Sequence, residues 1–125
     1  MDENELSTII IGKCIDIHRE LGPGLLESVY EEILAYELSD IGLGVQRQKG
    51  IPVHYKGRKM DIGFRADLII EDLVLVELKS IESILNVHQK IVLTYLRLTG
   101  IKLGLLINFN EALLKDGISR IVNNL

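Results

Sequence analysis

Apolar residues in the first forty positions recur every three or four residues, which is the period of an amphipathic α-helix. A first helix is predicted from about residue 4 to residue 21, and the Gly22-Pro23-Gly24 segment is expected to end it. A second helix is predicted over residues 25–40. Its expected inward-facing positions are Leu26, Val29, Ile33 and Leu34.

After residue 44 the period changes to two, which is typical of strands. Three strands are predicted at 45–55, bent near 50–52, at 61–70 and at 73–79, with a turn at 56–58. A third helix at 83–99 and a buried strand at 103–108 follow, while residues 117–122 fit a short strand or a helix equally well. The pattern predicts one α/β domain over residues 1–125, a central mixed sheet of about four or five strands flanked by helices.

Two acidic residues interrupt the apolar strands. Asp67 precedes Leu-Ile-Ile, and Glu77 lies between Val76 and Leu78, with Lys79 two positions further on. A buried carboxylate is costly unless it is paired, protonated or bound to a metal. A three-residue loop at 71–73 would pair Asp67 directly with Glu77, whereas a two-residue turn would send Glu77 to the other face. We therefore predict an odd loop or a bulge here.

Asp67, Glu77 and Lys79 could together support hydrolysis of a phosphate ester. Hard cations such as Mg²⁺ take one or two carboxylates with water and phosphate oxygens, and a nearby lysine can stabilise developing negative charge. Glu27, in the first turn of the second helix, could reach this centre, although the helix dipole also explains an acid there. The D-x9-E-x-K spacing alone is a weak signal, since acid-x-Lys also occurs in salt-bridged surface strands.

Composition narrows the class of protein only slightly. The net charge of −4 argues against a surface coated for nucleic-acid binding, but metal-binding acids contribute to that charge themselves. Six Lys and Arg residues between positions 47 and 65 form either a solvated strand face or a track for phosphates. No apolar stretch approaches the roughly 18 residues of a membrane span, and the MDENE start is unlike a signal peptide, so we expect a cytoplasmic protein. The lone Cys14 is expected in the core.

Residues 24–30, GLLESVY, match the pattern that names the GxxExxY protein family. The segments LGPGLLESVYEE, FRADLII, VELKS, TYLRLTG and GLLINFN also resemble that family, in the same order, between His18 and Asn110. The family is assigned to the PD-(D/E)xK nuclease-like superfamily, which has a restriction-endonuclease-like core. The resemblance implies metal binding by Asp67 and Glu77, assisted by Glu27.

The resemblance also implies that Lys79 is the catalytic lysine and that the backbone carbonyl of Leu78 completes the metal shell. The expected cofactor is Mg²⁺ or Mn²⁺. The expected partner is nucleic acid, DNA before RNA, with no membrane. A homodimer is a further option, because a chain this short often needs two copies to grip a duplex.

The third helix departs from the family pattern. Related sequences place a glutamine four residues before the helix tyrosine, but here Ile91 stands four before Tyr95. His88 shares the face of Tyr95 and could replace the glutamine, or it could simply pack, whereas Gln89 points elsewhere.

Substrate contacts are predicted for four residues, each with a structural alternative. Arg65 could hold a phosphate or pair with Glu77, and Tyr30 could contact substrate or lie at the edge of the core. His88 and Tyr95 complete the set.

Three hypotheses follow. The first is a metal-dependent nuclease built on Glu27, Asp67, Glu77 and Lys79. The second is a module that keeps the nuclease fold and binds nucleic acid or protein without catalysis. The third is an assembly subunit whose acids form salt bridges.

Overall fold

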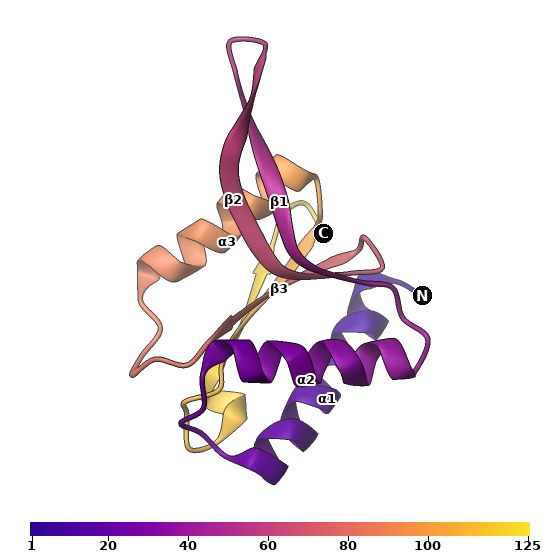
Figure 1. Ribbon diagram of the computed structural model, residues 1–125, viewed down its shortest axis with the longest axis vertical. Coiled ribbons are helices and arrows are strands. Elements are labelled where there is room, and N and C mark those ends of the chain that lie inside the picture. The colour runs from indigo at the N-terminus through magenta and orange to yellow at the C-terminus, as the bar shows by residue number, and fades with distance from the viewer.

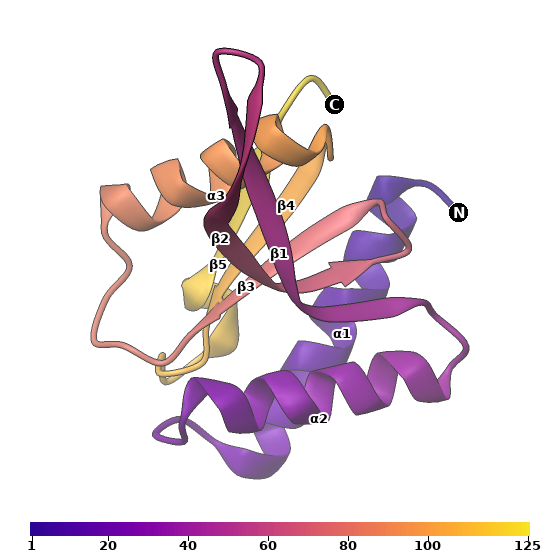
Figure 2. The same cartoon turned by 45° about the horizontal axis from the view of Figure 1, so that its top comes forward.

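The computed structural model describes residues 1–125, apart from the side chain of Ile62. The first two helices lie on one side of the molecule (Figures 1 and 2). Helix α1 spans Glu3–Leu21, and Asp2 caps it by accepting a hydrogen bond from the Glu5 amide at 2.8 Å. Gly22 ends α1 with a φ of 71°, a backbone conformation that suits glycine. The predicted stop at this glycine is confirmed.

Helix α2 spans Glu27–Asp40 and begins two residues later than the apolar pattern predicts. Leu26 is its N-cap and is 73% exposed, so its predicted inward orientation is wrong. Val29 and Ile33 are only partly buried. The residues of α2 that are buried are Tyr30, Glu31, Leu34, Ala35 and Leu38.

Five strands form one sheet in the order β1-β2-β3-β4-β5. The strands are β1 (Val45–Tyr55), β2 (Arg58–Ile70), β3 (Val74–Lys79), β4 (Leu103–Asn108) and β5 (Ile118–Val122). Strands β3 and β4 are parallel and are joined by α3 (Asn86–Thr99), and the other neighbours are antiparallel. The predicted α/β fold with a mixed sheet is confirmed. The ambiguous tail is strand β5, preceded by a short 3-10 helix, η1 (Leu114–Gly117).

Helices cover both faces of the sheet (Figure 2). One apolar core lies between the sheet and helices α1 and α2, and a second lies between the sheet and α3. Residues Val74 to Leu78 of β3 are all buried, as expected for a central strand with helices on both sides. Among the described residues, no helix combines the length and apolar character needed to cross a membrane.

Strands β1 and β2 continue as a twisted hairpin that projects beyond the rest of the sheet (Figures 1 and 2). Their pairing shifts between Ile51 and Val53, close to the predicted bend. Opposite this shift, the backbone of Gly63 approaches β1 so closely that an added Cβ would overlap the carbonyl oxygen of Ile51. Glycine is therefore required where the hairpin leaves the sheet.

Candidate active site

The β2–β3 connection brings the two predicted acids together. Ile70 pairs with Val74, which leaves three residues, 71–73, as the loop. Two of these, Glu71 and Asp72, adopt left-handed backbone conformations with φ of 53° and 54°. Extending the Leu68–Val76 pairing by one residue on each strand sets Asp67 opposite Glu77. The predicted odd loop is confirmed.

Backbone amides hold both carboxylates in place. The Asp67 amide donates to Oε1 of Glu77 at 2.9 Å, and the Leu78 amide donates to Oδ2 of Asp67 at 2.8 Å. Each strand thus contributes an amide to the acid of its neighbour. Both side chains are oriented by the sheet before any ligand arrives.

Burial dominates the electrostatics of this pair. Glu77 is 6% exposed, and burial raises its pKa to about 8, with a further upward contribution from the charge of Asp67. Burial also raises the pKa of Asp67, and the hydrogen bond from Leu78 acts in the opposite direction. The raised pKa favours the protonated form of Glu77 in the protein alone, and a cation placed between the two carboxyls would favour the ionised form.

Lys79 and Glu27 flank the pair. Lys79 ends β3 half-buried, and its charge lowers the pKa of both acids. Glu27 is the exposed first residue of α2, and its charge raises the pKa of Glu77. Within the described part of the chain, no three His, Cys, Asp or Glu side chains form a group that could hold a metal. Glu27 thus approaches the Asp67–Glu77 pair without completing a three-carboxylate site.

Sequence reasoning missed Gln48, which donates to Asp67, and the network of Glu31 and Arg47 behind it. Gln48 Nε2 donates to Oδ1 of Asp67 at 3.2 Å and to Oε1 of Glu31 at 2.6 Å. Buried Glu31 also accepts from Nε and Nη2 of Arg47, at 3.2 and 3.0 Å. Gln48 has a φ of 50°, which is unusual for a residue within a strand and interrupts the alternation of β1. The one sequence signal for this network was Glu31, four residues after Glu27 and hence on the same helix face.

The two tyrosines differ in their environments. Tyr30 is fully buried and stacks on Phe109 at 4.3 Å between ring centroids, while its hydroxyl donates to the Gly22 carbonyl at 2.6 Å. Its predicted contact with substrate is wrong, because its ring and hydroxyl are both used inside the protein. Tyr95 of α3 is 8% exposed and lies against Phe64 of β2. Burial, followed by the charges of Glu77 and Asp67, raises the pKa of Tyr95.

The remaining candidates for substrate contact lie on β2 and α3. Arg65 is exposed on β2, and among the described side chains it forms no ion pair with Glu77. His88 Nδ1 accepts a hydrogen bond from the Leu85 amide at 2.8 Å, and so caps the first turn of α3. Gln89 lines a groove beside β5, away from the acids, and Ile91 is exposed. Neither His88 nor Gln89 takes the place of the glutamine usual at position 91, because His88 caps α3 and Gln89 lines the groove beside β5.

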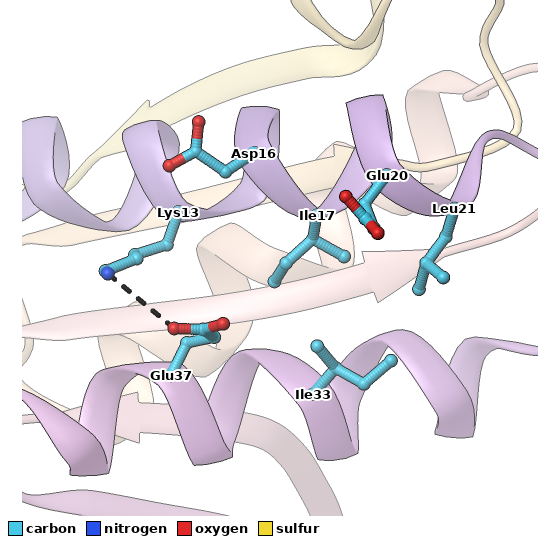
Figure 3. Close-up of a pocket in the computed structure, with 7 residues that line it drawn as sticks. All are labelled: Lys13, Asp16, Ile17, Glu20, Leu21, Ile33 and Glu37. Atoms are coloured by element: carbon cyan, nitrogen blue, oxygen red, sulfur yellow. Dashed lines mark ion pairs between the residues drawn. The ribbon is translucent and has the colours of Figure 1, made fainter.

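A separate groove runs between α1 and α2 (Figure 3). Ile17, Leu21 and Ile33 line it, and Lys13 Nζ bridges to Oε2 of Glu37 at 3.6 Å. None of the predicted site residues lines this groove. The Asp67–Glu77 pair is instead set into the sheet, between β2 and β3.

Comparison with known proteins identifies the family. No curated protein and no solved structure shows a significant match to the chain. A family model described as the PD-(D/E)XK nuclease superfamily matches residues 4–121. This match covers nearly all of the chain, including both acidic strands and α3. The chain therefore belongs to the PD-(D/E)XK nuclease superfamily.

Proposed function

We propose that the protein is a metal-dependent nuclease that hydrolyses phosphodiester bonds of nucleic acid. The observation that carries this proposal is the Asp67–Glu77 pair, oriented by reciprocal backbone hydrogen bonds and followed by Lys79. Membership of a nuclease superfamily supports the reaction class. Burying two adjacent acids destabilises a fold, so their presence in the central strands favours a functional explanation.

The donor set fits a hard divalent cation such as Mg²⁺ or Mn²⁺. Two carboxylates with water and substrate oxygens are a usual shell for Mg²⁺. The pKa of Glu77 is raised first by burial and then by the charge of Asp67, and a cation bound between the two carboxyls would favour the ionised form of both. Asp67 and Glu77 would hold the ion, with the Leu78 carbonyl as a further oxygen and Glu27 assisting through its charge. The bound ion supplies Lewis-acid stabilisation of charge on the phosphate.

The chain's own residues would orient the carboxylate of Asp67 and stabilise negative charge on the phosphate. Gln48 and the Leu78 amide fix the two oxygens of Asp67, so that its remaining lone pairs point in a defined direction. The Lys79 ammonium would lie beside the scissile phosphate and stabilise the negative charge that develops as water attacks phosphorus and a P–O ester bond breaks. DNA as the preferred substrate, a homodimer and a cytoplasmic location remain predictions.

A second candidate is a module that binds nucleic acid without cleaving it. Ile91 at the position of the usual glutamine favours this alternative, as does the lack of a third metal-binding side chain among the described residues. The two candidates differ in turnover and in the effect of a chelator.

The test is cleavage of labelled single- and double-stranded DNA and RNA with Mn²⁺, with and without EDTA. We expect wild type to cleave at least one substrate and Glu77→Ala to lose about 10²–10³-fold in rate, because the substitution removes half of the acidic pair. Glu37→Ala, which removes an acid of the α1–α2 groove, is the matched control and should retain activity.

The outcomes separate the candidates. Equal cleavage by wild type and Glu77→Ala would contradict the site and indicate a contaminating nuclease. Binding of nucleic acid by wild type, without cleavage in any metal, would favour the non-catalytic module.

A further inference from the structure

Positive charge is concentrated on the β1–β2 hairpin. Residues 47–65 contain six Lys and Arg residues and one acid, Asp61, a net charge of +5. Since the whole chain carries −4, the other residues together carry −9. A polyanion would therefore be repelled by most of this surface and attracted by the hairpin.

The part of the hairpin beyond the register shift, residues 53–64, is here called the hairpin arm. It projects past the sheet in both views (Figures 1 and 2), and residues 54–61 are all exposed. An isolated two-stranded ribbon gains little from apolar burial and is marginally stable by itself. Core packing thus does not explain why the two strands run so far.

The cations of the hairpin are largely free to meet a ligand. Arg47 pairs with Glu31, but among the described side chains no ion pair involves the arm cations Lys56, Arg58 and Lys59. Lys56 lies over the exposed ring of Tyr55, with Nζ 5.5 Å from the ring centroid. Asp61 is the one acid in the sequence of the arm, so residues 53–64 keep a net charge of +2.

The strand register distributes this charge over both faces of the arm. His54 pairs with Lys59, so these side chains share one face, and Tyr55 pairs with Arg58 on the other. A groove of a nucleic-acid duplex is bordered by phosphates on both sides. The B-DNA major groove is also wide enough to admit a two-stranded β-ribbon.

We propose that the hairpin arm binds duplex DNA by lying in its major groove, with Lys56, Arg58 and Lys59 contacting the bordering phosphates. The proposal rests on the proposed function for its substrate class. Asp67 lies nine positions after Arg58 along β2, so the tip lies at most roughly 30 Å from the acids. That span corresponds to about nine base-pair steps. The arm would hold the duplex within one turn of the phosphate to be cleaved.

The test compares two triple variants that remove equal charge. Lys56→Gln/Arg58→Gln/Lys59→Gln neutralises the arm tip, and Lys90→Gln/Lys102→Gln/Lys115→Gln removes three exposed cations elsewhere. Binding to a labelled duplex of about 20 base pairs, long enough to span the arm and the acids, is followed by fluorescence anisotropy in EDTA over a series of salt concentrations. Circular dichroism confirms folding, and Lys59→Gln alone serves if the arm triple misfolds.

We expect the arm triple to weaken duplex binding by about 100-fold or more at low salt and to reduce the salt slope by about 2–3, because each lost phosphate contact removes close to one unit. The control triple should bind within a few-fold of wild type. Equal losses in both triples, or no loss in the arm triple, would overturn the proposal. Tighter binding of single strands than of the duplex would also overturn it.

A small phosphodiester separates this proposal from the proposed function. Hydrolysis of bis-p-nitrophenyl phosphate with Mn²⁺ needs the acidic pair but not the arm, so the arm triple should retain it while Glu77→Ala loses it. If wild type hydrolyses no substrate, the proposed function fails, yet the anisotropy measurement still decides the arm.

Discussion

The two ends of β2 place charge in opposite environments. At one end Asp67 lies beside buried Glu77, where desolvation raises the pKa of both acids and backbone amides fix their positions. At the other end Arg58 and Lys59 stand exposed on the hairpin arm. A buried charge is strongly coupled to its neighbours, whereas exposed charges act nearly independently and are screened by salt.

One strand can therefore carry two roles. Changes among the buried acids should alter the chemistry and the stability of the fold, while changes on the arm should alter the affinity for a polyanion. Three substitutions test that separation. They replace Gly63, where the arm leaves the sheet, Glu77 of the acidic pair, and Gln48, which donates to Asp67.

The largest loss of stability is expected from Gly63→Ala, at the boundary between the arm and the sheet. The new Cβ would overlap the Ile51 carbonyl, so β1 and β2 must separate where the arm leaves the sheet. We expect the free energy of unfolding to fall by about 1–3 kcal/mol in urea denaturation. Gly50→Ala is the matched control, because nothing lies within 4 Å of the position that its Cβ would take, and its change should stay within about 0.5 kcal/mol. Equal stability of both variants would contradict the close approach.

The acidic pair makes a prediction about pH. The pKa of Glu77 is about 8 in the folded protein against 4.5 for the free side chain, so between these values the folded state binds more protons than the unfolded state. The stability of wild type in EDTA should therefore fall as pH rises from 4.5 to about 8. Glu77→Gln lacks this titration and should exceed wild type near the upper end of that range by up to about 4 kcal/mol.

Urea unfolding at a series of pH values from about 5 to about 8 checks this expectation. The gap between variant and wild type should be small at the acidic end and widest at the alkaline end. Parallel pH profiles for the two proteins would show that the pKa of Glu77 is not raised in the folded protein.

The smallest effect is expected from Gln48→Leu, which removes the amide donor to Asp67 and Glu31. We expect about a tenfold loss of cleavage rate, since one hydrogen bond to a charged group is worth roughly 1.5 kcal/mol. That hydrogen bond lowers the pKa of Asp67, so its loss should also move the acidic limb of the pH–rate profile to higher pH.

Gln46→Leu, an exposed glutamine of the same strand, is the control and should leave rate and profile unchanged. A rate loss in Gln48→Leu without any shift of the profile would argue for a purely structural role.

The placement of Asp67 opposite Glu77 could be predicted, because it depends only on whether the loop between their strands has an odd or an even number of residues. Once the loop length is odd, alternation along two strands determines which side chains share a face. The α/β class and most element boundaries were predictable for a similar reason, since the apolar period changes sharply after residue 44.

Features that depend on tertiary contacts were not predictable. Tyr30 is buried because its hydroxyl fastens the loop after α1, a partner eight residues away that no period reveals. Gln48 reaches Glu31 and Asp67 because its backbone is left-handed within a strand, which breaks the alternation used for prediction. Leu26 falls outside α2 because the helix begins at Glu27.

The order of the strands in the sheet has a consequence for folding kinetics. Each strand pairs with the one before it in the chain, so most ladders close over short stretches of sequence. Low contact order favours fast folding, because little loop entropy is lost before pairing begins. The parallel β3–β4 ladder must wait for α3 to cross the sheet, and we expect it to be the slowest pairing to form. Lys79 lies in that ladder, so the completed centre would be a late product of folding.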